Sequence, residues 1–164
     1  MYVQLSLGSN LGERAAALQA ALRALAAGSS VTLLSHSHCY ETEPIGIKNQ
    51  PPFLNMAVEI ETDLDPLELL KTVKAIEQKL GRKESAHWGP REIDIDIILW
   101  GQTVFTSAQL TLPHKEFRNR AFVLVPMAEI APEAVDPVTG ETVANLARRP
   151  NMEGWIEKRE KIVP

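Results

Sequence analysis

Residues 88–100 read Trp88-Gly89-Pro90-Arg91-Glu92-Ile93-Asp94-Ile95-Asp96-Ile97-Ile98-Leu99-Trp100. The alternation is typical of a β-strand, in which residues two apart point to the same face. The isoleucines at 93, 95 and 97 therefore share one face, and Asp94 and Asp96 share the other. Like charges side by side repel and aspartate is a poor strand former, so the pair indicates a bound divalent cation such as Mg²⁺. With Arg91 just before the strand, the pattern favours a phosphate ligand.

The plainer alternative is an exposed sheet face with two solvated acids. Two basic loops count against it, and their residues are Arg82, Lys83 and Arg91 before the strand and His114, Lys115, Arg118 and Arg120 after it. Neighbouring cations should lower the pKa of His114. Arg118 and Arg120 are two apart in irregular chain, so we expect only one of them to reach the site.

Composition indicates an ordinary globular protein. The chain has 164 residues, 45% hydrophobic and 23% charged, which suits one domain with a real core. A net charge of −4 argues against a nucleic-acid partner. The single cysteine favours a reducing compartment. The sequence has no apolar run long enough to span a bilayer and no start typical of a signal peptide. We therefore expect a cytoplasmic protein without a membrane partner.

The pattern of elements predicts the fold class. Strands are expected at residues 1–7, 31–40, 53–62 and 93–100. One helix is expected after Asn10, its proposed N-cap, and another after the cap Asp65, with Pro66 at its first position. The order β-α-β-β-α-β is that of a ferredoxin-like α+β fold, an antiparallel sheet with helices on one face. We expect one domain over 1–164, with a core at 1–100 and a C-terminal extension at 101–164.

Two further motifs bear on the ligand. The segment Gly8-Ser9-Asn10-Leu11-Gly12 lacks the spacing and the lysine of a phosphate-binding P-loop, so we interpret it as a tight strand-to-helix turn. Phe53, Asn55 and Phe122 could line a flat slot for a planar heterocycle. The alternative is that both phenylalanines belong to the core.

At these residues the chain resembles the 6-hydroxymethyl-7,8-dihydropterin pyrophosphokinases of folate biosynthesis, from the N-terminus to about Pro132. The resemblance is strongest in the stretch from Trp88 to Ile98. Supporting motifs, in the same order as in the family, are Gly8-Ser9-Asn10-Leu11-Gly12, Tyr40 with Thr42-Glu43-Pro44-Ile45-Gly46, Phe53-Leu54-Asn55, Pro113-His114 and Asn119-Arg120-Ala121-Phe122. Several separated motifs in order are more specific than any one alone.

The resemblance implies an ATP-dependent transferase that moves pyrophosphate from ATP to the hydroxymethyl group of the pterin and releases AMP. It implies that Asp94 and Asp96 hold two Mg²⁺ ions and that Arg82 and Arg91 act in catalysis with them. The implied pterin-binding residues are Thr42, Pro44, Ile45, Phe53, Asn55 and Phe122. The implied ATP-binding residues are Lys74, Glu77, Arg82, Trp88, Arg91, His114 and Arg120.

The residues alone are also compatible with two other functions. A metal-dependent nuclease or phosphodiesterase would share the paired aspartates but would need a longer basic track. A non-catalytic ferredoxin-like binding module would explain the fold but not acids flanked by arginines. The sequence has no heptad seam, so we expect a monomer.

Overall fold

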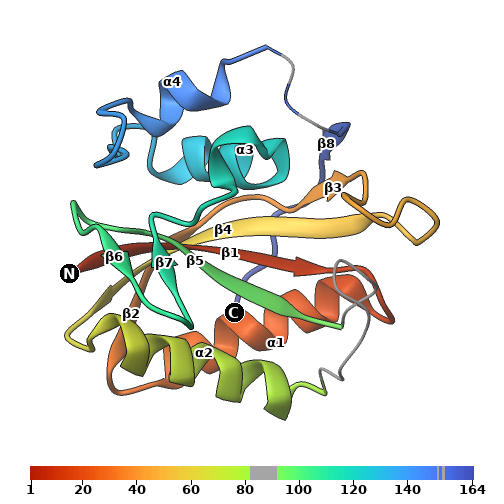
Figure 1. Ribbon diagram of the computed structural model, residues 1–164. Helices are drawn as coiled ribbons and strands as arrows, with labels where there is room; N and C mark the ends of the chain where they lie inside the picture. Colours follow the sequence, from red (N-terminus) through yellow and green to blue (C-terminus); the bar gives the residue numbers. More distant parts are fainter. Residues whose placement is uncertain (82–91, 151, 153) are drawn as a thin grey trace.

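The computed structural model describes residues 1–81, 92–150, 152 and 154–164 (Figure 1). The strands are β1 Tyr2–Ser9, β2 Val31–His36, β3 Tyr40–Thr42, β4 Phe53–Thr62, β5 Asp94–Trp100, β6 Phe105–Thr106, β7 Thr111–Leu112 and β8 Ile156–Lys158. The helices are α1 Arg14–Ala27, α2 Pro66–Lys79, α3 Ala121–Ile130 and α4 Val143–Ala147, with a 3₁₀ turn at Phe117–Asn119.

The main sheet is antiparallel throughout. Its strand order is β5-β1-β4-β3-β8, and β2 pairs with β4 next to β3. Since β2 and β3 pair with successive parts of the same edge of β4, together they occupy the place of one strand. The four positions β5, β1, β4 and β2/β3 then follow the ferredoxin-like order, which confirms the predicted fold class.

The expected single strand over 31–40 is wrong in detail, because the chain breaks at Ser37. The Ser37 hydroxyl accepts a hydrogen bond from the Ala57 N–H at 2.9 Å and donates to the His38 carbonyl at 2.7 Å. A side chain thus takes a ladder bond that a strand backbone would make. The break divides the segment into β2 and β3.

Helices cover both faces of the sheet (Figure 1). Helices α1 and α2 lie on one face, and α3 and α4 lie on the other. The three isoleucines 93, 95 and 97 are buried with Leu22 and Leu69 on the α1/α2 side. This confirms that the isoleucine face meets those helices. The aspartate face consequently looks toward α3.

The two helix starts differ from each other. Asp65 and Glu68 form the expected capping box, since each side chain accepts a hydrogen bond from the other residue's N–H at 2.8 Å. Asn10 does not cap α1, which begins three residues beyond the predicted start, at Arg14. The Asn10 amide instead donates to Gln50 Oε1 at 2.8 Å and to the Pro51 carbonyl at 3.0 Å. The turn is thereby tied to the loop before β4.

The C-terminal extension contributes both helices and a strand of the main sheet. It forms α3 and α4 and then returns to the sheet, where β8 pairs with β3. Within the part of the chain that the structure describes, no helix is long and apolar enough to cross a bilayer.

Candidate active site

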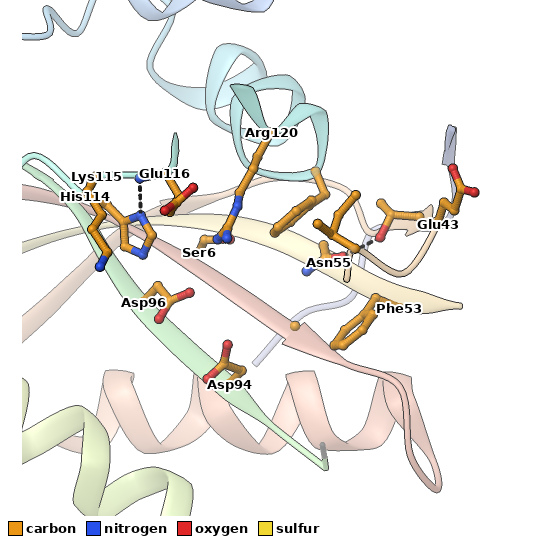
Figure 2. A pocket seen from close by; sticks show the side chains of 14 residues that line it. Ser6, Glu43, Phe53, Asn55, Asp94, Asp96, His114, Lys115, Glu116 and Arg120 are labelled. Carbon is orange, nitrogen blue, oxygen red and sulfur yellow. Dashed lines mark hydrogen bonds between the residues drawn. The ribbon is translucent and has the colours of Figure 1, made fainter. Parts of the chain in front are cut away.

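The aspartate pair lies on β5 at the floor of a pocket of about 360 Å³. Asp96 is opposite Ser6 and Asp94 is opposite Gly8 on the neighbouring strand β1. Both carboxylates point from β5 into the pocket, toward the side chain of Arg120, which extends from the start of α3 (Figure 2). The volume is in the range of small-molecule sites.

The pair is electrostatically unfavourable without a cation. Burial raises the pKa of Asp96, and the nearby charge of Asp94 raises it further. The charges of Lys74 and Arg120 act in the opposite direction but do not cancel the effect. Two half-buried carboxylates on one strand face are therefore suited to a positively charged ligand.

Helix α2 supports the aspartate strand from the opposite face. The Glu77 side chain is 2% exposed, and its carboxylate accepts a hydrogen bond from the Ile95 N–H at 2.7 Å. Lys74 Nζ lies 3.3 Å from the other carboxylate oxygen. Neither residue is among the described residues that line the pocket. The bond from Ile95, which stands between the two aspartates, fixes their strand to α2.

His114 is a neutral hydrogen-bond donor at one end of the pocket. Burial lowers its pKa to about 4, with a further contribution from the charge of Arg120. The expectation of a lowered pKa is confirmed, although burial is the larger cause. His114 Nδ1 accepts a hydrogen bond from the Glu116 N–H at 3.1 Å, so the ring proton resides on Nε2 (Figure 2). A neutral imidazole held in this tautomer can donate to a phosphate oxygen.

Only one of the two arginines reaches the site, as predicted. Arg118 turns away to form a bidentate pair with buried Asp136, with Nη2 2.9 Å from Oδ1. Arg120 lines the pocket, and its guanidinium lies 5.4 Å from the centre of the Phe122 ring. One arginine therefore lies above the aspartates, while the other joins two parts of the C-terminal extension.

The other end of the pocket is flat and aromatic. Phe53, Asn55 and Phe122 all line it, which confirms that they come together. Asn55 is 4% exposed, and its Oδ1 accepts a hydrogen bond from the Thr42 hydroxyl at 2.6 Å. A Cβ on Gly8 would lie 2.5 Å from Asn55 Nδ2, so glycine is required where β1 passes this amide. The amide is thus held in one orientation.

The predicted residues are distributed as follows. Of the expected pterin-binding set, Thr42, Ile45, Phe53, Asn55 and Phe122 line the pocket, whereas Pro44 is buried and is not among the lining residues described. Arg82, Trp88 and Arg91 lie outside the described residues. Sequence reasoning missed Ser6, Gly8, Glu43 and Glu116 as lining residues, and it named Lys115 only as part of the second basic loop. Ser6 and Gly8 could have been found only from the pairing register of β1 with β5, and the sequence does not show that register.

The pocket therefore has three parts in a row (Figure 2). The ring and amide of Phe53 and Asn55 occupy one end, His114 the other, and the aspartates lie between them. A planar polar ligand fits the first end and an anion fits the second.

Comparison with known proteins gives the family. The family model of 7,8-dihydro-6-hydroxymethylpterin-pyrophosphokinase (HPPK) matches residues 4–132, which is most of the chain. The chain belongs to the HPPK family. A Methylorubrum extorquens protein named 2-amino-4-hydroxy-6-hydroxymethyldihydropteridine pyrophosphokinase is 44% identical over 156 residues, covering 95% of this chain and 97% of its own. A Bacillus subtilis protein of the same name is 43% identical over 135 residues, covering 82% and 81%.

Solved structures support the fold of this HPPK family member. The crystal structure of wild-type HPPK-DHPS from Plasmodium falciparum superposes with a TM-score of 0.70 at 16% identity. The match covers 89% of this chain and 44% of the other, so the chain spans less than half of that longer protein. At this identity the likeness concerns the fold alone.

Proposed function

We propose that the pocket transfers pyrophosphate from ATP to the hydroxymethyl oxygen of 6-hydroxymethyl-7,8-dihydropterin and releases AMP. The observation that carries this proposal is the placement of the aspartate pair beside a planar slot, with the donor His114 at the opposite end and Arg120 above the pair. The pterin ring suits the slot, and the triphosphate suits the end with Arg120 and His114. The family and the names of the relatives agree with this reaction.

The donor set fits magnesium. Mg²⁺ in phosphate-transfer sites takes one or two carboxylates and fills its other positions with water and phosphate oxygens. The described residues offer Asp94 and Asp96 and contain no group of three or more histidine, cysteine or acidic side chains that could enclose a metal. We propose that these two carboxylates hold two Mg²⁺ ions, which when bound would neutralise charge on the triphosphate and on the attacking oxygen.

The protein's own groups act by orientation and charge. Thr42 and Asn55 would fix the edge of the pterin ring while Phe53 and Phe122 stack on its faces. The hydroxymethyl oxygen would attack the β-phosphorus and give its proton to Asp94 or to solvent, and AMP would leave with the α–β bridging oxygen. The His114 Nε2–H and the Arg120 guanidinium would donate to phosphate oxygens during this step.

The remaining assignments of the ATP side are proposals of the same kind. Lys74 and Glu77 lie on α2 behind the aspartate strand, where Lys74 adds positive charge near Asp96. We also propose roles for Arg82, Trp88 and Arg91, on the family resemblance alone. The proposed molecule is a cytoplasmic monomer, and light scattering should give the mass of one chain.

Product analysis tests the reaction. ATP, the hydroxymethyl pterin and Mg²⁺ should yield AMP, and chelation with EDTA should abolish turnover until Mg²⁺ is restored. ADP as the product would indicate an ordinary kinase. Pterin binding without turnover would indicate a binding module.

Variants test the aspartates. Asp94→Asn and Asp96→Asn should each lower kcat on the order of 10²-fold or more, since loss of one preorganised charged group typically costs this much. Asp63→Asn is the matched control, because Asp63 is exposed and lies outside the pocket. Near-normal turnover of the first two variants would contradict the metal assignment.

A further inference from the structure

The C-terminal segment 154–160, here called the strap, lies against the pocket. The family match ends at residue 132, so the strap lies beyond it. Within the strap, β8 pairs with β3 in the register Thr42 opposite Ile156 and Tyr40 opposite Lys158. Since Thr42 lines the pocket, the strap is paired directly with a strand that builds the pterin side.

The strap also continues past β3 to the pocket loop, residues 43–46. The Glu43 N–H donates to the Trp155 carbonyl at 3.1 Å, and the Trp155 N–H donates to Glu43 Oε2 at 3.3 Å. Glu43 and Ile45 both line the pocket. These contacts are made by the backbone of the strap, so they do not depend on the half-exposed indole ring.

Gly154 has the conformation that this approach requires. Its φ is +86°, in the left-handed region that side chains rarely adopt. A Cβ at this position would lie 3.5 Å from Glu43 Cβ and 3.5 Å from Ile45 Cδ1. The chain therefore turns at Gly154 in direct contact with the pocket loop.

The far end of the strap is firmly attached. Arg159 donates to Glu41 Oε2 at 2.7 Å, and its N–H donates to the Cys39 carbonyl at 2.7 Å. Beyond the strap, Ile162 packs on the core of the α1/α2 side, and the Val163 carbonyl accepts a hydrogen bond from Gln19 at 2.9 Å. The chain thus passes from the pocket loop along β3 and ends beside α1 (Figure 1).

From these contacts we infer that the strap is a positioning element for the pterin pocket. A three-residue strand is marginal alone, and β3 is held in the sheet between β4 and β8. The strap holds Thr42 toward Asn55 and holds the pocket loop over the slot. The contacts of the strap described above lie on the pterin side of the pocket, so its effect is on pterin affinity. This inference rests on the proposed function.

Gly154→Val tests the strap, with Gly140→Val as the matched control. Both glycines have positive φ, +86° and +76°, so both valines impose similar backbone strain. A Cβ at Gly140 would meet nothing within 4 Å, and Gly140 does not line the pocket. Only the first variant should disturb Glu43 and Ile45.

We expect Gly154→Val to weaken pterin binding roughly fivefold relative to Gly140→Val, measured by calorimetry with 6-hydroxymethyl-7,8-dihydropterin. The KM for ATP and the kcat at saturating pterin should stay within about twofold, since only ground-state binding of one substrate is lost. Amide hydrogens of residues 43–48 should exchange faster in Gly154→Val alone. Equal pterin affinity and equal exchange in the two variants would overturn the inference.

If Gly154→Val does not fold, Arg159→Ala decides by the same measurements, because it removes the bond from the strap to Glu41. Its control is Arg149→Ala, which removes an ion pair to Glu141 outside the strap. The same experiments distinguish an error in the proposed reaction from an error in the role inferred for the strap. Absence of AMP formation by the unaltered chain would refute the function, whereas the exchange comparison still reports on the strap.

Discussion

Replacement of Glu77 by alanine should destabilise the protein and disturb its aspartate strand. The Glu77 side chain is 2% exposed and accepts the Ile95 N–H at 2.7 Å. Alanine leaves that buried N–H without this acceptor. Glutamine keeps an acceptor of nearly the same shape and removes only the charge.

The magnitude is worked from the contacts of Glu77 with Ile95 and Lys74. An unsatisfied buried N–H costs about 1–3 kcal/mol. The Lys74 side chain is 47% exposed, so screening limits the ion pair to less than about 1 kcal/mol. Glu77→Ala should therefore lower the free energy of unfolding by roughly 1–4 kcal/mol and the Tm by about 2–16 °C. Glu77→Gln should lose about 1 kcal/mol.

Urea denaturation followed by circular dichroism measures the effect, with Gln78→Ala as the control. Gln78 is the exposed neighbour on α2, and its replacement should change stability by less than about 0.5 kcal/mol. Equal denaturation midpoints for Glu77→Ala and Gln78→Ala would refute the reasoning. The KM for ATP in Glu77→Gln separately tests the proposed ATP role, since a purely supporting carboxylate leaves it unchanged.

Three further predictions concern other parts of the molecule. Gly8→Ala should weaken pterin binding roughly tenfold in calorimetry, because its Cβ would displace the Asn55 amide; unchanged affinity would count against that amide as a ligand. Burial opposes ionisation of Asp136, but hydrogen bonds, chiefly from Arg118, outweigh it and hold the Asp136 pKa at about 2. This stabilisation is present above the unfolded pKa, which is about 3.8, and is lost as pH falls through 2. The difference in unfolding free energy between wild type and Asp136→Asn should accordingly shrink from on the order of 2 kcal/mol at neutral pH to near zero, and a pH-independent difference would contradict it. Burial, and secondarily the charge of Glu160, raises the pKa of Cys39 to about 11, so a disulfide reagent at pH 8 should label Cys39 only in denaturant.

The sequence by itself determined the local features. Period-two alternation placed Asp94 and Asp96 on one strand face because side chains in a strand alternate whatever surrounds them. The capping box at Asp65 and Glu68 is likewise a contact between residues three apart, so its pattern is readable in the chain.

Only the tertiary structure decided the features that depend on contacts distant in sequence. Ser6 and Gly8 face the aspartates because of the β1–β5 register, which spans about 90 residues. The prediction that Asn10 caps a helix is wrong, because its amide donates a hydrogen bond to Gln50, 40 residues away. The strap joins β3 across more than 100 residues, and no local pattern specifies such a partner. Propensity and alternation act over a few residues, whereas pocket assembly is set by which surfaces the packed sheet brings together.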